Sequence, residues 1–565
     1  MSTAFSCKDA FDVSPENEVD YKNAYQNIYD ANAAVIGIYG QLLSIAEQYE
    51  VLNELRADLM DVTVNADPNL QQINNHAVSQ GNPYADPKPF YAIILNCNDV
   101  LKNLQIMYDN NRINKDEFDQ RYSDIGAVRS WLYFQLGIHF GEIPYITSPI
   151  ENIDDVKDES KFPKMVLADL VKTLITYMES LPFKDPYPTA NSLITQMDGY
   201  PSKLFFINKN CLLGDLYLWD NNYHQAAINY KMVLETSTSL GEAAGDIYYM
   251  QYVGSDQDVD EVKPGVWQTY FSRSPQDDEY QWEWIWTLVF DKNFKPVNPF
   301  IKLFSNSGGA YQVKPSQSAI DNWNSQVQTD GTPIDPRGLN NSYRIINGQP
   351  VIMKFLYNYL DNSTSLPNNL LEKNGKWFLY RTSLLHLRYA EAANRENYDK
   401  IAYALINQGI KTTYAFNPTT TDATEKQATF LPFPYDLDGR KIDAPRIRGK
   451  YHRNLGIRSR LKISSSTIDS ARFFDMSVPS QFDKAVTDRA GFTNYMEDKI
   501  IDEAALELAY EGNRWPDLMR IALRRNDPAY LADKVYDKLL KAGNPQAAAV
   551  RAKLMNKANW YLPFK

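Results

Sequence analysis

Histidine and cysteine, the side chains that most often bind transition metals, are scarce in this chain of 565 residues. The five histidines are isolated and lack a paired metal-binding spacing such as His-Glu-x-x-His. The cysteines, Cys7, Cys97 and Cys211, are odd in number and far apart, so neither a disulfide framework nor a metal cluster follows. We therefore expect neither a metal nor another cofactor.

Long hydrophobic runs are also missing, since no stretch of 18 or more consecutive apolar residues occurs. We expect no segment that spans a membrane. The motifs Gly-x-Ser-x-Gly and Gly-x-x-x-x-Gly-Lys are absent, so neither a hydrolase nor a nucleotide-binding function has motif support. Two carboxylates among the 70 acidic residues could still serve an all-helical glycosidase, and this alternative stays open.

Positive charge is outnumbered, because 58 Lys and Arg stand against 70 Asp and Glu and give a net charge of -12. This balance argues against a general binder of nucleic acid or anionic membranes. Residues 440–462 differ, with nine Lys or Arg and one Asp. They could meet an anionic ligand or a transporter loop, but pairing with the protein's own plentiful carboxylates is favoured.

One acidic stretch approaches a calcium-binding pattern. Asp256, Asp258 and Asp260 alternate, but Glu261 stands where an EF-hand needs glycine for its sharp turn. An EF-hand is therefore excluded, whereas a looser calcium site stays open beside the alternative of a solvated acidic loop.

Helical periodicity covers much of the chain, with apolar residues recurring at three- and four-residue intervals. It predicts helices in residues 25–46, 90–107, 124–140, 163–181, 493–525 and 530–558. The fourth of these is expected to open with Pro163, which is well tolerated in a first helical turn.

Residues 204–235 form the most informative helical pair, because a polar break at 220–222 separates two periodic halves. The pair resembles a tetratricopeptide (TPR) repeat, in which small residues let two helices approach closely. The positions that carry the pattern are Leu213, Gly214, Tyr217, Tyr223, Ala226 and Tyr230. Residues 381–410 repeat the order of helix, polar turn and helix, so stacked helical hairpins are the predicted scaffold.

The predicted fold class is all-α, a single domain over residues 1–565 in which a TPR-like helical-hairpin scaffold carries a large irregular, loop-rich region. The scaffold is expected at about 20–60, 88–238, 378–412 and 493–565. The irregular region is expected at about 61–87, 240–376 and 413–489, where helical periodicity is weak or lost. Long irregular stretches on a rigid scaffold usually carry binding residues, so we expect the ligand there.

Several short blocks, in order along the chain, resemble the SusD/RagB family of outer-membrane nutrient-binding lipoproteins of Bacteroidetes. Residues 127–150 resemble a family helix with an arginine and then a Phe-Gly-acid-x-Pro turn, carried by Arg129, Phe140, Gly141, Glu142 and Pro144. Residues 311–319 resemble the family's Pro-Ser step, 335–337 its Asp-x-Arg, and 388–395 its late helix.

The most specific block is 500–520, which resembles the family's closing acidic helix followed by Glu-Gly-x-Arg-Trp and Asp-Leu-x-Arg. It is carried by Glu507, Leu508, Glu511, Gly512, Arg514, Trp515, Asp517, Leu518 and Arg520. From the residues alone this block is structural, because Glu507 and Glu511 lie four apart on one helix face and the arginines can pair with nearby carboxylates.

The resemblance implies a SusD-like fold and binding without catalysis. It implies capture of an oligosaccharide or polysaccharide at the extracellular face of the outer membrane, and delivery to a SusC-like TonB-dependent transporter. It also implies a signal peptide and a lipid on a cysteine near the start of the chain, and Cys7, which precedes a polar stretch, fits this role. The protein would contact the membrane through this N-terminal lipid alone.

The predicted ligand platform is aromatic and lies mainly in residues 266–290. Trp282, Trp284 and Trp286 alternate, so an extended chain would place all three indoles on one face, where sugar rings could stack. The full set of candidate residues is Trp267, Tyr270, Trp282, Trp284, Trp286 and Tyr84. The other interpretation is that these aromatics pack the irregular region onto the helices, as large aromatics usually do.

Two alternative functions stay open. Within the same family the ligand would be a peptide, which would favour backbone pairing and side-chain pockets. Outside the family the chain would be a TPR-type scaffold that binds only other proteins. The irregular insertions count against this scaffold, because an interaction solenoid usually repeats without such interruptions.

Overall fold

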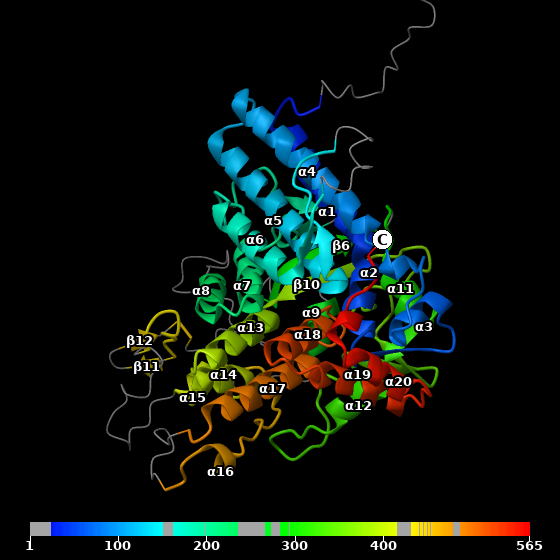
Figure 1. Cartoon of the computed structure of the whole chain (residues 1–565), viewed down its shortest axis with the longest axis vertical. Coiled ribbons are helices and arrows are strands. Elements are labelled where there is room, and N and C mark those ends of the chain that lie inside the picture. Colours follow the sequence, from blue (N-terminus) through cyan, green and yellow to red (C-terminus); the bar gives the residue numbers. More distant parts are fainter. Residues whose placement is uncertain are drawn as a thin grey trace, which may run out of the picture.

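The computed structural model describes residues 24–150, 162–197, 199–235, 266–272, 283–292, 294–414, 431–439, 441–443, 446–448, 450–451, 454–477 and 486–564. Helices dominate it and the strands are short (Figure 1), which confirms the predicted all-α class. The buried apolar side chains form one continuous cluster. Within the described ranges every helix is too short or too polar to span a bilayer.

The helices of the first half begin with α1 and end with α9. Their bounds are α1 Ile28–Leu42, α2 Ala46–Glu50, α3 Pro68–Asn74, α4 Lys88–Asp109, α5 Lys115–Phe140, α6 Leu167–Ser180, α7 Lys209–Trp219, α8 Tyr223–Leu234 and α9 Val266–Ser272. A π-helical turn, Val51–Leu55, continues α2.

The helices of the second half run from α11 to α20. Their bounds are α11 Pro299–Phe304, α12 Gln317–Asn324, α13 Thr382–Arg395, α14 Asp399–Ile406, α15 Gly409–Thr413, α16 Ser470–Phe473, α17 Arg489–Glu507, α18 Arg514–Arg524, α19 Ala529–Lys541 and α20 Ala547–Leu554.

Every strand pair is antiparallel and two-stranded in the part of the chain that the structure describes. The pairs are β1 (Met60–Val62) with β7 (Val313–Pro315), β2 (Glu142–Pro144) with β3 (Lys164–Val166), β4 (Gln196–Met197) with β5 (Tyr200–Pro201), β6 (Trp284–Phe290) with β10 (Gly375–Arg381), β8 (Tyr343–Ile346) with β9 (Gln349–Ile352), and β11 (Lys441–Asp443) with β12 (Arg446–Arg448). Several of these short elements occupy parts of the region that was expected to be irregular.

Two predicted helix starts differ from the structure. Helix α5 begins nine residues before the expected start at 124, because Asn114 caps it and Glu117 completes a capping box. The prediction that a helix opens at Pro163 is wrong. Residues Lys164–Val166 pair with β2 instead, and α6 begins only at Leu167.

The predicted helical hairpins are present as α7 with α8 and α13 with α14. Asn221, with φ of 61°, makes the turn between α7 and α8. Gly214 faces the ring of Tyr230 so closely that a Cβ there would lie 2.5 Å from a ring carbon. The small residue of this TPR-like pattern therefore permits the close helix contact that the sequence predicts.

The last helices of the chain pack against its early segments. Helices α19 and α20 lie beside α3 at the lower right of Figure 1, where Asn544 between them bonds to Asn75 just after α3. Between α17 and α18, Gly512 takes a φ of 71°, and a Cβ there would meet the ring of Tyr49 at 2.2 Å. This close approach explains the glycine in the Glu-Gly-x-Arg-Trp segment.

Candidate functional site

The tryptophans expected to form an exposed platform are buried. Trp267, Tyr270, Trp284 and Trp286 each expose at most 4% of their surface. The prediction of a surface platform is therefore wrong for these four residues, and the packing interpretation describes their position. Trp282 and Cys7 lie outside the described residues.

The contacts of these side chains explain their burial. Trp284 Nε1 donates to the carbonyl of Tyr270 at 2.9 Å, and its ring stacks on Phe378 with centroids 4.1 Å apart. Trp286 Nε1 donates to the carbonyl of Phe205 at 2.9 Å. Both tryptophans lie in β6, whose nearly continuous apolar sequence suits a strand that is covered on both faces.

Tyr84, the sixth aromatic candidate, is buried as well. Its hydroxyl donates to Glu47 Oε1 at 2.8 Å, and burial together with Glu47 raises the pKa of Tyr84 above its usual range. However, the preceding part of the same segment, residues 61–75, forms one wall of a large groove.

This groove, here called the amide groove, has a volume of about 780 Å³, within the range of ligand-binding clefts. It brings together β1, the loop that follows it, α3, the start of β7, the start of β9 and the turn between α19 and α20. The lining residues are Asp61, Val62, Thr63, Val64, Asn65, Gln71, Asn74, Asn75, Tyr311, Lys314, Gln349, Ala542, Asn544, Pro545 and Gln546.

Side-chain amides dominate the chemistry of the amide groove. Each amide group offers both donors and acceptors, which matches ligands that carry many hydroxyl groups. Asp61 and Lys314 stand opposite each other in the β1–β7 pair and bring one charge of each sign. The groove therefore suits a neutral, polar ligand.

The floor of the amide groove is fixed by a chain of hydrogen bonds. Lys538 Nζ donates to Asn74 Oδ1 at 2.8 Å and to the carbonyl of Leu55 at 2.8 Å. Asn74 Nδ2 in turn donates to Asp61 Oδ1 at 3.0 Å. Burial lowers the pKa of Lys538 to about 8, and Asp61 and Asp58 oppose this shift. All these partners hold Asn74 in one orientation.

The opposite wall is held by hydrogen bonds of the Tyr311 segment. Tyr311 has a φ of 52°, and its hydroxyl donates to the carbonyl of Pro350 at 2.9 Å. The Thr63 amide donates to the carbonyl of Gln312 at 2.9 Å. The wall is therefore preorganised, while Asn65, Gln349 and Gln546 at the rim remain exposed to solvent.

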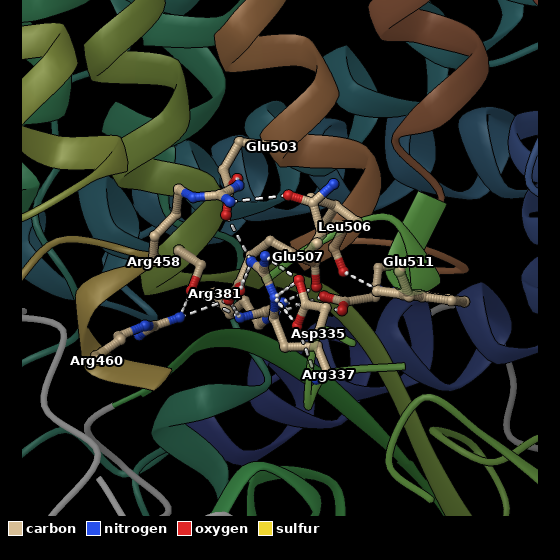
Figure 2. A network of polar contacts seen from close by, with 12 residues as sticks. Asp335, Arg337, Arg381, Arg458, Arg460, Glu503, Leu506, Glu507 and Glu511 are labelled. Carbon is tan, nitrogen blue, oxygen red and sulfur yellow. Dashed lines mark hydrogen bonds and ion pairs between the residues drawn. The ribbon is translucent and has the colours of Figure 1, made fainter. Parts of the chain in front are cut away.

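A buried charge network ties together two of the segments that resemble the family, 335–337 and 500–520 (Figure 2). Arg337 Nη2 donates to Asp335 Oδ2 at 2.6 Å, and its Nη1 donates to Glu503 Oε1 at 2.7 Å and Glu507 Oε2 at 2.9 Å. The predicted Asp-x-Arg segment thereby meets the end of α17.

Glu507 is the centre of this network. Its Oε1 accepts hydrogen bonds from Arg381 Nη1, at 2.8 Å, and from Arg460 Nη2. Burial opposes ionisation of Glu507, but Arg460, Arg381 and Arg337 outweigh it and hold its pKa below the usual range of glutamate. A carboxylate held ionised by three guanidinium groups cross-links the fold and is poorly suited to donate a proton.

The network also accounts for part of the basic stretch 440–462. Arg458 Nη1 donates to Glu503 Oε2 at 2.7 Å, and Lys450 pairs with Glu235. Together with Arg460 these cations pair with the protein's own carboxylates, which is the interpretation that the sequence favoured. The arginines are buried, however, rather than on the surface. The acidic stretch at 256–261 lies outside the described residues.

The amide groove is connected to the segment 500–520 through α18. Arg514 Nε and Nη2 donate to the two carboxylate oxygens of Asp58 at 2.6 and 2.8 Å. Ser316, next to β7, donates through its hydroxyl to the Asp58 carbonyl at 2.6 Å. Both strands of the β1–β7 wall are therefore anchored to the closing segment of the chain.

Metal-binding chemistry finds no support in the described ranges, where no group of three or more His, Cys, Asp or Glu side chains is placed to hold an ion. His76 Nε2 lies 2.8 Å from the Arg56 carbonyl and His139 Nδ1 lies 3.2 Å from Arg56 Nη1, and burial lowers the pKa of both histidines well below the usual range.

Comparison with known proteins gives a family match for the second half of the chain. Residues 304–564 match the SusD family. No protein among those with curated descriptions matches the chain significantly.

Solved structures extend this match to the whole fold. A SusD superfamily protein from Bacteroides vulgatus is 14% identical with a TM-score of 0.58, over 95% of this chain and 96% of that one. Another from Bacteroides thetaiotaomicron is 15% identical with a TM-score of 0.55, over 94% and 98%. A SusD-like carbohydrate binding protein from Bacteroides fragilis is 15% identical with a TM-score of 0.53, over 89% and 88%.

The predicted family resemblance is therefore confirmed. Residues 304–564 match the SusD family, and the fold of the chain is similar to that of solved SusD superfamily proteins.

Sequence reasoning missed most of the groove-lining residues. The amide groove does draw residues 61–75, 311–314 and 349 from segments that were expected to be irregular. The turn at 542–546 was instead expected to belong to the scaffold. The turn-forming pairs Asn347-Gly348 and Gly543-Asn544 mark the hairpin and the helix turn beside the groove, but no pattern shows that they meet.

Proposed function

We propose that this protein binds a neutral oligosaccharide or polysaccharide in the amide groove, without catalysis, for import by a SusC-like TonB-dependent transporter. The amide groove carries this proposal, because its lining presents many amide groups and nearly balanced charge. The relative from Bacteroides fragilis that is described as carbohydrate binding supports the same ligand class.

Binding is favoured over hydrolysis by the acid content of the groove. Retaining glycosidases need two carboxyl groups roughly 5–5.5 Å apart, one of them able to donate a proton. Asp61 is the carboxylate in the lining, and it already accepts hydrogen bonds from Asn74 Nδ2 and the Val62 amide. A glycosidase would therefore lack its second acid at this site.

A peptide ligand and a protein-binding TPR scaffold fit the geometry less well. A peptide that added a strand would need a long free edge, but β1 and β7 have three residues each. A TPR-type scaffold would present its hairpins to a partner, but α13 is buried along nearly its whole length. These observations leave an oligosaccharide as the favoured ligand.

Two further parts of the proposal rest on the family resemblance. A lipid on Cys7 would hold the protein at the extracellular face of the outer membrane. A transporter beside it would receive the captured ligand. The described helices, each too short or too polar to span a bilayer, are compatible with this arrangement.

The binding proposal is tested by replacing two exposed amides of the groove, in the double variant Gln349→Ala/Gln546→Ala. Wild-type protein should select neutral glycans on a glycan array and select nothing from a peptide library. Calorimetry with the selected glycan should show at least about five-fold weaker binding by the variant, equivalent to about 1 kcal/mol. The melting temperature should change little, because both side chains are exposed.

The double variant Gln105→Ala/Gln317→Ala is the matched control. It removes two exposed glutamines from α4 and α12, outside the groove. It should bind the glycan like the wild type. Enrichment of peptides with no glycan bound, or equal affinity of both double variants, would place the binding site or the ligand class elsewhere.

A further inference from the structure

A second polar groove lies away from the first, where α1 and α5 begin. Its volume is about 590 Å³, and it includes residues Tyr29, Asn114, Gln120, Arg121, Asn191 and Ser192. In Figure 1 the turn from α4 into α5 stands at the top of the molecule, whereas α3 and α20 beside the amide groove lie at the lower right. The two grooves therefore use different elements. We call this one the α1–α5 groove.

Buried hydrogen bonds hold the α1–α5 groove together. The Arg121 side chain is 1% exposed, and its Nη2 donates to Asn32 Oδ1 at 2.7 Å and to Ser192 Oγ at 3.2 Å. Asn191 Nδ2 donates to Gln120 Oε1. The loop at 188–192 is thus fixed onto both helices, so the shape of the groove does not depend on a ligand.

Most charges at the α1–α5 groove are already occupied. Lys115 pairs with Asp119, and the Arg121 guanidinium is surrounded by amide, hydroxyl and carbonyl acceptors. Both helix starts are capped, because Asn27 accepts from the Tyr29 amide and Asn114 accepts from the Glu117 amide. The helix ends therefore offer little to an anion, and the groove again suits a neutral ligand.

Tyr29 adds the feature that the amide groove lacks. Its side chain is 74% exposed, although it belongs to a large aromatic residue. An exposed ring beside amide and hydroxyl groups can stack on the apolar face of a sugar ring while its neighbours bond to hydroxyls. A single exposed aromatic is common on protein surfaces, but here it borders a preformed polar groove.

We propose that the α1–α5 groove is a second oligosaccharide site, in which Tyr29 stacks on a sugar ring and Gln120, Asn191 and Ser192 bond to hydroxyls. This inference rests on the proposed function, since it assigns the same ligand class to another surface. One glycan long enough to reach both sites would be held more firmly than by either site alone, whereas two short glycans would bind independently.

Native mass spectrometry can count the bound ligands. The probe is a defined mixture of neutral hexasaccharides of glucose, mannose, xylose and galactose. Wild-type protein should carry up to two hexasaccharides, and Tyr29→Ala and Gln349→Ala/Gln546→Ala should each carry one. The combined triple variant should carry none. Phe294→Ala, which removes an aromatic side chain of similar exposure at 71%, is the matched control and should still carry two.

The outcomes separate the two proposals. If Tyr29→Ala still carries two hexasaccharides, the second site is overturned and the amide groove stays in place. The same holds if wild type carries one hexasaccharide and Gln349→Ala/Gln546→Ala carries none. If wild type carries one hexasaccharide and only Tyr29→Ala loses it, the assignment of the amide groove is overturned instead. Wild type that binds no hexasaccharide would overturn both.

Discussion

Glu54 shows how single residues join distant parts of this chain. Its carboxylate accepts backbone N–H groups of Tyr510, Asn513 and Arg514, at 3.2, 2.9 and 3.2 Å. These donors precede or open α18, so Glu54 acts as a cap for that helix from across the chain. Burial nevertheless raises the pKa of Glu54 from 4.5 to about 8, against the effect of those three amides.

The raised pKa predicts a pH-dependent stability. Between about pH 4.5 and 8 the folded protein keeps a proton on Glu54 that the unfolded chain releases, so this residue's contribution to stability is lost as pH rises. The unfolding free energy of wild type, relative to Glu54→Gln, should fall by up to about 1.4 kcal/mol per pH unit. Urea unfolding at pH 5, 6 and 7 measures it.

Glu142→Gln, at an exposed carboxylate, is the control, and its pH profile should run parallel to that of wild type. A Glu54→Gln profile that also runs parallel to wild type would mean that Glu54 is already ionised in the folded protein.

The aromatic residues show where sequence reasoning reached its limit at this scale. The spacing of Trp284 and Trp286 fits an extended strand, and the structure contains that strand. The spacing does not tell whether the strand faces solvent. That depends on β10, which pairs with it from nearly a hundred residues later, and on Trp131, which meets Trp286 with ring centroids 5.1 Å apart.

Individual helices were largely predictable, because amphipathic periodicity and caps are local properties of the sequence. The α7–α8 hairpin is the clearest case, since its polar turn and its small residue at Gly214 both have the predicted roles. The two-stranded pairs were not predicted. Apart from β6 and β10, their strands are two to four residues long, too short for a period-two pattern to stand out.

The hairpin contact predicts a cost for enlarging Gly214. A Cβ there would lie 2.5 Å from one ring carbon of Tyr230, whose hydroxyl is held by Asp215 Oδ1 at 2.6 Å. Gly214→Ala should therefore lower the unfolding free energy by about 1–3 kcal/mol through overpacking, although alanine is the better helix former. Urea or thermal unfolding of the purified variant measures this loss.

Gly37→Ala in α1 is the matched control, because nothing lies within 4 Å of a Cβ at that position. It should leave stability unchanged or raise it by up to about 1 kcal/mol. Equal effects of the two substitutions would show that the helices of the hairpin can separate at no cost.

At the scale of the whole molecule, the short blocks that resemble the family predicted the fold better than the spacing of individual residues did. The segments 335–337 and 500–520 are far apart in sequence, yet they form one buried network around Glu507. The amide groove could not be predicted in this way. It depends on how the turn at 542–546 packs beside α3, a contact that joins nearly opposite ends of the chain.

The proposed assembly is tested in outer membranes of a cell that carries the full-length precursor. Wild-type protein should incorporate a fatty-acid analogue and co-purify with a TonB-dependent transporter in mild detergent. A stable complex of this kind often buries more than about 2,000 Å². Cys7→Ala should lose the lipid label and be released from the membrane.

The control is Cys97→Ala, at a buried cysteine of α4, which should keep the label. Equal labelling of wild type and Cys7→Ala would reject the anchor. Recovery of the labelled wild type as a lone monomer would count against the transporter.

The cap that Glu54 provides also sets an order of events in folding. Its donors follow it by more than 450 residues, so these hydrogen bonds can form only after nearly the entire polypeptide has been synthesised. Closing so long a loop is entropically slow, and contacts of this separation form late. The early helices can therefore form during synthesis. The wall of the amide groove is anchored through Asp58 and Arg514, so it takes its final shape only after α18 has been synthesised.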